Sequence, residues 1–291
     1  MKRNVAFGLM ILLSLLMASC KTPQPQPTVE FESTATTQAI TLAPTTETLA
    51  APISTTPVTA PAPDTATPTV APNLPSGLWS VRAYNTNDAN IILVNEHIAG
   101  VAFCCEGDTG WIDISAQLNN EVNYLTFVNV NSATGAKWGF SLSHNDTVVW
   151  GNEGESGQPN TLAYVQTLQV AGDDSATAVD LKDPNKTSLA GTWTAQVKAD
   201  DVGLLLVNGV PVTGGFGEGF GWVDISGLLY AGQNNIIRGM VWNSREGYSW
   251  AMTVRNGETI VWSSESSGSG QTGEVLYTTV IIDGDGNLMS R

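Results

Sequence analysis

The sequence predicts an all-β protein with two tandem β-sandwich domains, which follow a disordered tether rich in proline and threonine. Three observations support this fold class. A proline- and threonine-rich stretch occupies residues 21–75. The rest of the chain consists of short strand-like runs broken by turns, a pattern typical of sandwiches. These runs form two copies of one unit of about 95 residues, the ordinary size of a domain.

The first 19 residues predict a signal peptide. Lys2 and Arg3 give a basic start, and the apolar run over residues 5–17 is shorter than the roughly 20 residues of a membrane span. The segment LMASC (residues 16–20) resembles a bacterial lipobox. That resemblance implies acylation of Cys20 and an exported protein, lipid-anchored to the cell or outer membrane with its domains outside the cytoplasm. An ordinary signal peptide with a chance cysteine is the alternative.

Residues 20–76 would then comprise the lipidated cysteine and a linker. Residues 21–75 hold 11 prolines and 15 threonines, with one aromatic residue, Phe31. Such a segment cannot bury enough apolar surface to offset the entropy of ordering, so we expect a disordered tether.

The formal net charge of the whole chain is −15. This charge argues against a nucleic-acid partner, because phosphate binding requires basic patches. Contact with the membrane would therefore depend on the lipid anchor. Beyond Cys20 the chain holds only Cys104 and Cys105, so no disulfide framework is expected.

The internal repeat is clearest in WIDIS (residues 111–115) and WVDIS (residues 222–226). In addition, NVNSATGAKW (residues 129–138) aligns without gaps on VWNSREGYSW (residues 241–250). We therefore expect domains at residues 77–172 and 190–291, joined by a linker at 173–189.

The predicted elements within each unit are strands. IILVN (residues 91–95) and LLLVN (residues 204–208) are apolar runs that end in asparagine. RNGETIVW (residues 255–262) places Asn-Gly between two strand-like runs, which is a strong hairpin signal, and SHNDTVVW (residues 143–150) is its partner in the first unit.

The second unit contains LLLVNG (residues 204–209), WVDISGLL (residues 222–229) and GQNNIIRGMVWN (residues 232–243). This pattern resembles the galactose-binding-like jelly roll, as in the non-catalytic sugar-binding domain of family 2 glycoside hydrolases. The resemblance implies a jelly-roll fold with a binding or accessory role, since the barrel that carries the catalytic glutamates is missing. The first unit departs from the pattern at Glu96, which stands where the second has Gly209.

The repeated Asp113 and Asp224 are expected to brace a turn with Ser115 and Ser226, because Asp and Ser accept hydrogen bonds from local amides. We expect Trp111 and Trp222 to pack beneath that turn, since an aromatic residue kept in both copies favours a core position. Trp242 and Tyr248 answer to Val130 and Ala136. These two unpaired aromatic residues are therefore the candidate ligand-binding residues, with extra core packing as the alternative.

Other candidates concern redox and metal chemistry. Cys104 and Cys105 are adjacent and could form a vicinal disulfide, or remain two thiols. Four recurring acids are weak candidates for a structural calcium site, with solvated loop charge as the alternative: Glu106, Glu218, Glu153 and Glu265. No other cofactor is expected. His97 and His144 do not recur, and we expect neither to be catalytic.

These features together favour a non-enzymatic envelope lipoprotein that binds carbohydrate through tandem domains. The alternative is a structural or protein-interaction module of an envelope complex, without a glycan ligand.

Overall fold

The computed structural model describes residues 75–104, 107–119, 122–131, 135–156, 161–217 and 221–289. All of them belong to the second of two compact units, which spans Thr65–Arg291. The predicted signal peptide, Cys20 and the predicted tether as far as residue 74 lie outside the described residues.

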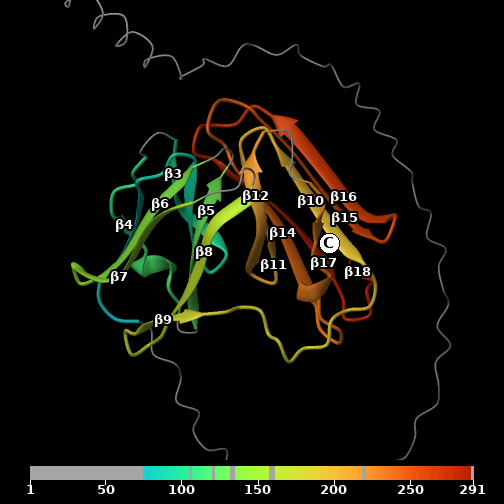
Figure 1. The fold of residues 1–291 in the computed structure, drawn as a ribbon, viewed down its shortest axis with the longest axis horizontal. Helices are drawn as coiled ribbons and strands as arrows, with labels where there is room; N and C mark the ends of the chain where they lie inside the picture. Colours follow the sequence, from blue (N-terminus) through green and yellow to red (C-terminus); the bar gives the residue numbers. More distant parts are fainter. Residues whose placement is uncertain are drawn as a thin grey trace, which may run out of the picture. The chain divides into compact units, whose positions relative to one another are not determined.

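The first half of the described chain forms two antiparallel sheets (Figure 1). The four-stranded sheet has the order β4 (Ile112–Asp113), β1 (Trp79–Tyr84), β6 (Ala136–His144), β7 (Thr147–Ser156). The five-stranded sheet has the order β3 (His97–Phe103), β2 (Ala89–Val94), β5 (Asn123–Asn131), β8 (Thr161–Val170), β9 (Ala176–Val179). Strand β9 lies within the segment 173–189 that we expected to be a linker, and it extends the first sandwich by pairing with β8.

The second half repeats this topology strand for strand. Its four-stranded sheet has the order β13 (Val223–Asp224), β10 (Trp193–Ala199), β15 (Tyr248–Asn256), β16 (Thr259–Gly268). Its five-stranded sheet has the order β12 (Val210–Phe216), β11 (Val202–Val207), β14 (Asn235–Trp242), β17 (Val275–Ile282), β18 (Leu288–Met289). A short 3₁₀ turn follows the repeated motif in each half, at η1 (Ser115–Gln117) and η2 (Ser226–Leu228). The predicted all-β class with two tandem sandwiches is confirmed.

Each sandwich has its own core between its two sheets. Trp79 and Trp193 open β1 and β10 and are fully buried. Both strands alternate buried residues with half-buried or exposed ones, because successive side chains of a strand point to opposite faces. One face of each four-stranded sheet therefore covers the core and the other face is open.

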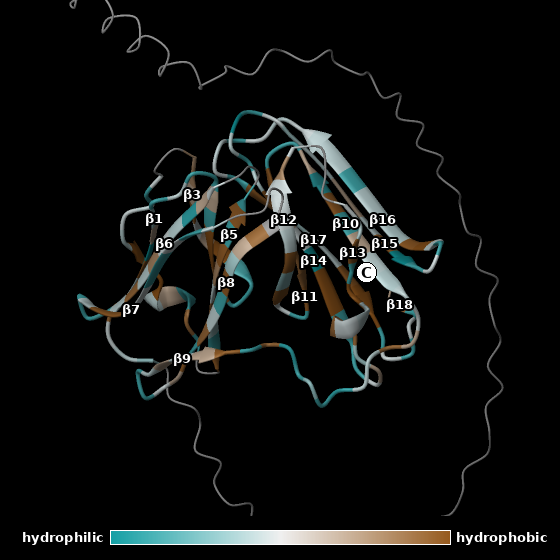
Figure 2. Ribbon diagram, viewed as in Figure 1, coloured by the Kyte–Doolittle hydropathy of each residue, from teal (hydrophilic) through white to brown (hydrophobic). Residues whose placement is uncertain are grey.

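Strands β2 and β11 do not alternate: every residue of both is buried. Their second faces belong to a third apolar cluster, here named the shared layer, which joins the two five-stranded sheets. Hydrophobic colouring runs along β11 and β14, and β16 is paler (Figure 2). The buried members of the shared layer are Ala89, Ile91, Leu93, Val128, Val130, Val202, Leu204, Leu206 and Met240.

Polar contacts border the shared layer. Glu96 forms an ion pair with Arg238 at 2.9 Å. The Ile98 amide donates a hydrogen bond to the Tyr277 hydroxyl at 3.0 Å. Each contact joins a residue of the first half to one of the second, so the two sandwiches are connected by both apolar and polar groups.

The repeated pentapeptide forms a hydrogen-bonded turn after the short edge strand. Asp113 Oδ1 accepts from the Ser115 amide at 2.9 Å, and Ser115 Oγ accepts from the Trp79 amide at 2.9 Å. The same two contacts recur in the second half, from Asp224 to Ser226 at 2.9 Å and from Ser226 to Trp193 at 2.8 Å. The motif thus ties the edge of the sheet to the start of its central strand.

The asparagine at the end of each apolar run forms a hydrogen bond with a second, buried asparagine. Asn208 Nδ2 donates to Asn235 Oδ1 at 3.0 Å, and the Tyr230 amide donates to the same oxygen at 2.7 Å. Asn235 Nδ2 donates to the Tyr230 carbonyl at 2.9 Å. Asn95 and Asn123 make the equivalent contact at 2.9 Å in the first half. Because Asn123 and Asn235 are fully buried, these bonds satisfy polar groups that would otherwise be costly.

Replacing Asn235 by Leu should lower the free energy of unfolding by about 3 kcal/mol, because several buried partners lose their hydrogen bonds. Urea denaturation followed by tryptophan fluorescence measures this change. Asn185→Ala is the control, since Asn185 is exposed. Equal effects of the two variants would contradict the role assigned to Asn235.

Truncating the shared layer by Leu204→Ala should destabilise the protein by about 3 kcal/mol, since Leu204 is almost fully buried. Both halves bury surface in this layer, so we expect one calorimetric transition that shifts as a whole. Leu288→Ala is the control at an exposed leucine. Two transitions of which only one moves would show that the layer does not couple the sandwiches.

Candidate functional site

The open faces of the two four-stranded sheets each carry an exposed tryptophan. Trp111 is 47% exposed and Trp222 is 39% exposed. The expectation that both pack beneath the turn is therefore wrong. The reason is strand alternation: Ile112 and Val223 pack against the two cores, so the preceding tryptophans lie on the outer faces.

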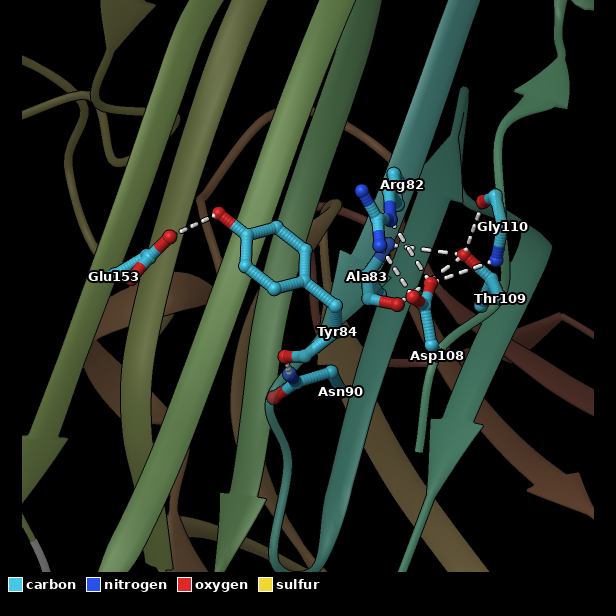
Figure 3. A network of polar contacts seen from close by, with 8 residues as sticks. All are labelled: Arg82, Ala83, Tyr84, Asn90, Asp108, Thr109, Gly110 and Glu153. Atoms are coloured by element: carbon cyan, nitrogen blue, oxygen red, sulfur yellow. Dashed lines mark hydrogen bonds and ion pairs between the residues drawn. The ribbon is translucent and has the colours of Figure 1, made fainter. Parts of the chain in front are cut away.

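Arg82 is the neighbour of Trp111 across the edge of the first sheet. Val81 pairs with Ile112, so the antiparallel register brings Trp111 alongside Arg82. Arg82 Nε donates to Asp108 Oδ1 at 3.0 Å, and Arg82 Nη2 donates to Asp108 Oδ2 (Figure 3). The Arg82 guanidinium also lies 5.0 Å from the centre of the Tyr84 ring.

The Arg82–Asp108 pair changes the pKa of both groups. The hydrogen bond from Arg82 holds the pKa of Asp108 below its ordinary 3.8, and Asp108 in turn raises the pKa of Arg82. Both groups are therefore charged at neutral pH. Because the pair is largely exposed to solvent, its contribution to stability is small. The pair instead holds its two charged groups in a fixed bidentate geometry.

A backbone clamp holds Asp108 in place. The Thr109 amide donates to the Ala83 carbonyl at 2.9 Å, and the Ala83 amide donates to Thr109 Oγ1 at 3.0 Å. The Gly110 amide donates to Asp108 Oδ1 at 2.8 Å (Figure 3). The loop from Asp108 to Gly110 is therefore fastened to β1, and the carboxylate is presented on a rigid support.

Tyr84 extends the polar network across the sheet. Its hydroxyl donates to Glu153 Oε1 at 2.5 Å (Figure 3). Its ring lies over Gly139, where a Cβ atom would come within 2.6 Å of the ring. Burial, and then the contact with Glu153, raise the pKa of Tyr84 above 10.0, so the tyrosine remains a donor at physiological pH. A glycine on the central strand thus allows Tyr84 to span two strands.

A shallow depression of about 260 Å³ adjoins this network. It is lined by Asn85, Lys137, Glu153, Gly154 and Glu155. The outer face of the first sandwich therefore presents, in strand order, an exposed indole, a charged pair, a tyrosine and a polar depression. We name this surface the Trp111 face.

The network is not repeated in the second sandwich. Gln196 and Lys198 stand where the first half has Arg82 and Tyr84. Instead, the Arg255 guanidinium lies 3.3 Å from the centre of the Trp222 ring. The two exposed tryptophans thus share a position in the fold but differ in their polar neighbours.

The two candidate ligand-binding aromatics occupy other places. Trp242 is half-buried against the shared layer, with its ring 5.3 Å from that of Phe103. Tyr248 is also half-buried, beside Gly268 on the neighbouring strand. The residues of the Trp111 face were not singled out from the sequence, apart from Glu153 and Trp111 itself.

The remaining candidates are placed as follows. Cys104 is disulfide-bonded and exposed. Glu265 is exposed, and Glu153 is bound by Tyr84. Among the described residues, no group of three or more His, Cys, Asp or Glu side chains could hold a metal ion. Three candidates lie outside the described residues: Cys105, Glu106 and Glu218.

The two histidines make structural contacts. His144 stacks on the buried Trp79, with ring centres 4.4 Å apart, and its Nε2 lies 2.9 Å from the Ser76 carbonyl. His97 meets the Tyr277 ring edge-on at 5.7 Å.

The part of the chain that the structure describes contains no helix with the length and apolar character of a membrane span. No protein-family model matches the sequence. No curated protein matches it either.

Two solved structures show a weak similarity. One is the lectin from Pleurotus ostreatus in complex with GalNAc, which is 11% identical over 77% of this chain and 79% of that chain, with a TM-score of 0.11. The other is the apo form of that lectin, 9% identical over 74% and 76%, with a TM-score of 0.11. A likeness at this TM-score carries no argument about fold or ligand.

The pKa of Asp108 should lie below 3.8 in the intact protein and rise toward 3.8 in Arg82→Gln. The stabilisation that this group gives is present above pH 3.8 and is lost as the pH falls through the lower folded-state value. Carboxyl NMR titration measures both values. Asp113 is the internal control, because bonds from Ser115 lower its pKa, and that pKa should not change. An Asp108 pKa unaffected by the substitution would refute the ion pair.

Proposed function

We propose that the protein binds carbohydrate through the Trp111 face. The single observation that carries this proposal is the exposed Trp111 indole, which the strand register places beside the Arg82–Asp108 pair. Carbohydrate presents flat C–H faces together with hydroxyl groups that both donate and accept. An indole ring offers a large apolar surface for the first, and charged groups offer strong hydrogen bonds to the second.

The Arg82–Asp108 pair retains hydrogen-bond donors and acceptors that such hydroxyls could use. A guanidinium has five N–H donors, and two of those of Arg82 are used on Asp108. A carboxylate has about four acceptor sites. One sugar hydroxyl could therefore accept from Arg82 and donate to Asp108. Glu153, which is exposed, supplies a further acceptor at the far side of Tyr84.

The proposed activity is binding without catalysis. A glycosidase needs a carboxylic acid with a raised pKa to protonate the leaving group. The pKa of Asp108 is shifted the other way, which keeps it an acceptor of hydrogen bonds. The carboxylate is thus suited to holding a hydroxyl, not to acid catalysis.

The proposed location is the bacterial cell envelope. It follows from the resemblance of residues 16–20 to a lipobox, with Cys20 as the lipidated residue. A proline- and threonine-rich tether of the length of residues 21–75 would let the binding face act away from the membrane surface.

Trp111→Ala should weaken glycan binding about tenfold or more, which corresponds to at least about 1.4 kcal/mol. The test is a glycan array on the full chain in detergent, followed by calorimetry with each positive neutral glycan. Trp111→Tyr should retain most of the affinity, because it keeps an aromatic face. Trp222→Ala is the matched control and should bind neutral glycans as the unchanged protein does. Binding that survives Trp111→Ala would refute the site.

A second candidate function is docking of an envelope protein, and one observation favours it. Val148 and Ile260 are 56% and 61% exposed near the starts of the edge strands β7 and β16, in equivalent hairpins. Edge strands with exposed apolar residues are common docking places for another chain. If no glycan binds, cross-linking of the envelope with the full chain and with Val148→Lys tests this candidate directly.

A further inference from the structure

The second sandwich carries an arginine that lies over the ring of its exposed tryptophan. Arg255 lies on β15 and Trp222 lies just before β13, with β10 between them. Thr194 of β10 pairs with both Asp224 and Arg255, so Arg255 reaches across Thr194 to place its guanidinium 3.3 Å from the ring centre. The contact fixes the plane of the guanidinium through cation–π attraction.

Arg255 differs from the other three described arginines in its lack of a carboxylate partner. Arg82, Arg238 and Arg245 each lie within 4.0 Å of an acid. No such pair includes Arg255 in the described part of a chain that holds 27 acidic residues. With so many acids available, a half-buried arginine on an indole without an acidic partner points to a positive charge that is available to bind another molecule.

Two polar atoms at this place also lack hydrogen bonds. Within the described residues, Arg255 Nε and Thr194 Oγ1 are buried and have no partner. The ring of Trp222 therefore orients the guanidinium without competition from hydrogen bonds to protein acceptors. The terminal N–H donors of a guanidinium lie in the plane of the group.

The neighbouring side chains on this face include hydroxyls and carboxylates. Thr253 Oγ1 and Ser263 Oγ lie 3.1 Å apart on the same outer face and can exchange bonds with hydroxyls. Asp224 is already engaged by the Ser226 amide, which holds its pKa below 3.8. Two further carboxylates belong to the same hairpin, Glu258 and Glu265, and neither forms an ion pair within the described residues.

We infer that the outer face of the second sandwich binds a carboxylate-bearing sugar, a uronic acid residue, through Arg255 and Trp222. The carboxylate would take the two parallel N–H donors of the guanidinium, a bidentate geometry that an ammonium group cannot offer. The inference rests on the proposed carbohydrate-binding function. It adds that the two outer faces bind different classes of sugar. Where Arg82 is neutralised by Asp108, the ligand is neutral; where Arg255 is unpaired, the ligand is acidic.

The test uses the full chain in detergent and a panel of uronate oligosaccharides of α-1,4, β-1,4 and β-1,3 linkage. Each is paired with its carboxyl-reduced neutral counterpart. Calorimetry should show at least one uronate that binds about tenfold or more tightly than its reduced form. Arg255→Ser, which installs the residue found at the equivalent Ser143, should remove that preference. Arg255→Lys should recover only part of it, because the bidentate contact is lost.

Trp111→Ala separates this inference from the proposed function. Uronate binding that survives Trp111→Ala and is lost in Arg255→Ser supports the second site. Uronate binding that is lost in Trp111→Ala and kept in Arg255→Ser overturns it and leaves the first site standing. If neutral glycans bind and no uronate binds, the inference is overturned and the proposed function stands. Failure of every neutral and acidic glycan overturns both.

Discussion

The burial of β2 and β11 on both faces is the constraint on which the rest of the structure depends. Each strand covers the core of its own sandwich with one face and contributes to the shared layer with the other. Because the five-stranded sheets use their second faces in this way, the outer faces of the four-stranded sheets remain open. The exposed Trp111 and Trp222 lie on those open faces. The packing of the sandwiches thus determines which surfaces are available to a ligand.

Duplication placed the same indole on both open faces, and divergence changed its surroundings. In the first sandwich Arg82 is held by Asp108, and Tyr84 passes over Gly139 to reach Glu153. In the second, Arg255 covers one face of Trp222 without an acid within 4.0 Å among the described residues. The arginine beside the indole comes from β1 in the first sandwich and from β15 in the second, and among the described residues only the first is paired with an acid. That difference, more than the tryptophan itself, sets the charge of the ligand that each face suits.

Local patterns predicted the parts of the fold that depend on neighbours in sequence. Asp113 accepts from an amide two residues away, so the hydrogen-bonded turn follows from the residue types alone. The apolar runs 91–94 and 204–207 were correctly predicted as strands, but their burial on both faces was not predicted. Recurrence did not predict the exposure of Trp111, because a residue kept in both copies can lie on the surface as well as in the core. The Arg82–Asp108 and Tyr84–Glu153 contacts join residues 26 and 69 apart, which the register of three strands brings together and no local pattern encodes.

The character of the Trp111 face favours carbohydrate over a protein partner as its ligand. Protein interfaces have apolar centres from which charged residues are depleted. Here a single indole lies on the same outer face as the Arg82–Asp108 pair and Glu153, and Glu153 lines a depression with Lys137 and Glu155. Covering these charges with an apolar partner would cost desolvation free energy that one tryptophan does not offset. A polyhydroxylated ligand avoids that cost, since its hydroxyls replace the water that the charged groups lose. A protein partner that covered the exposed Val148 and Ile260 would have a smaller desolvation cost. The two candidate functions therefore use different surfaces of one chain.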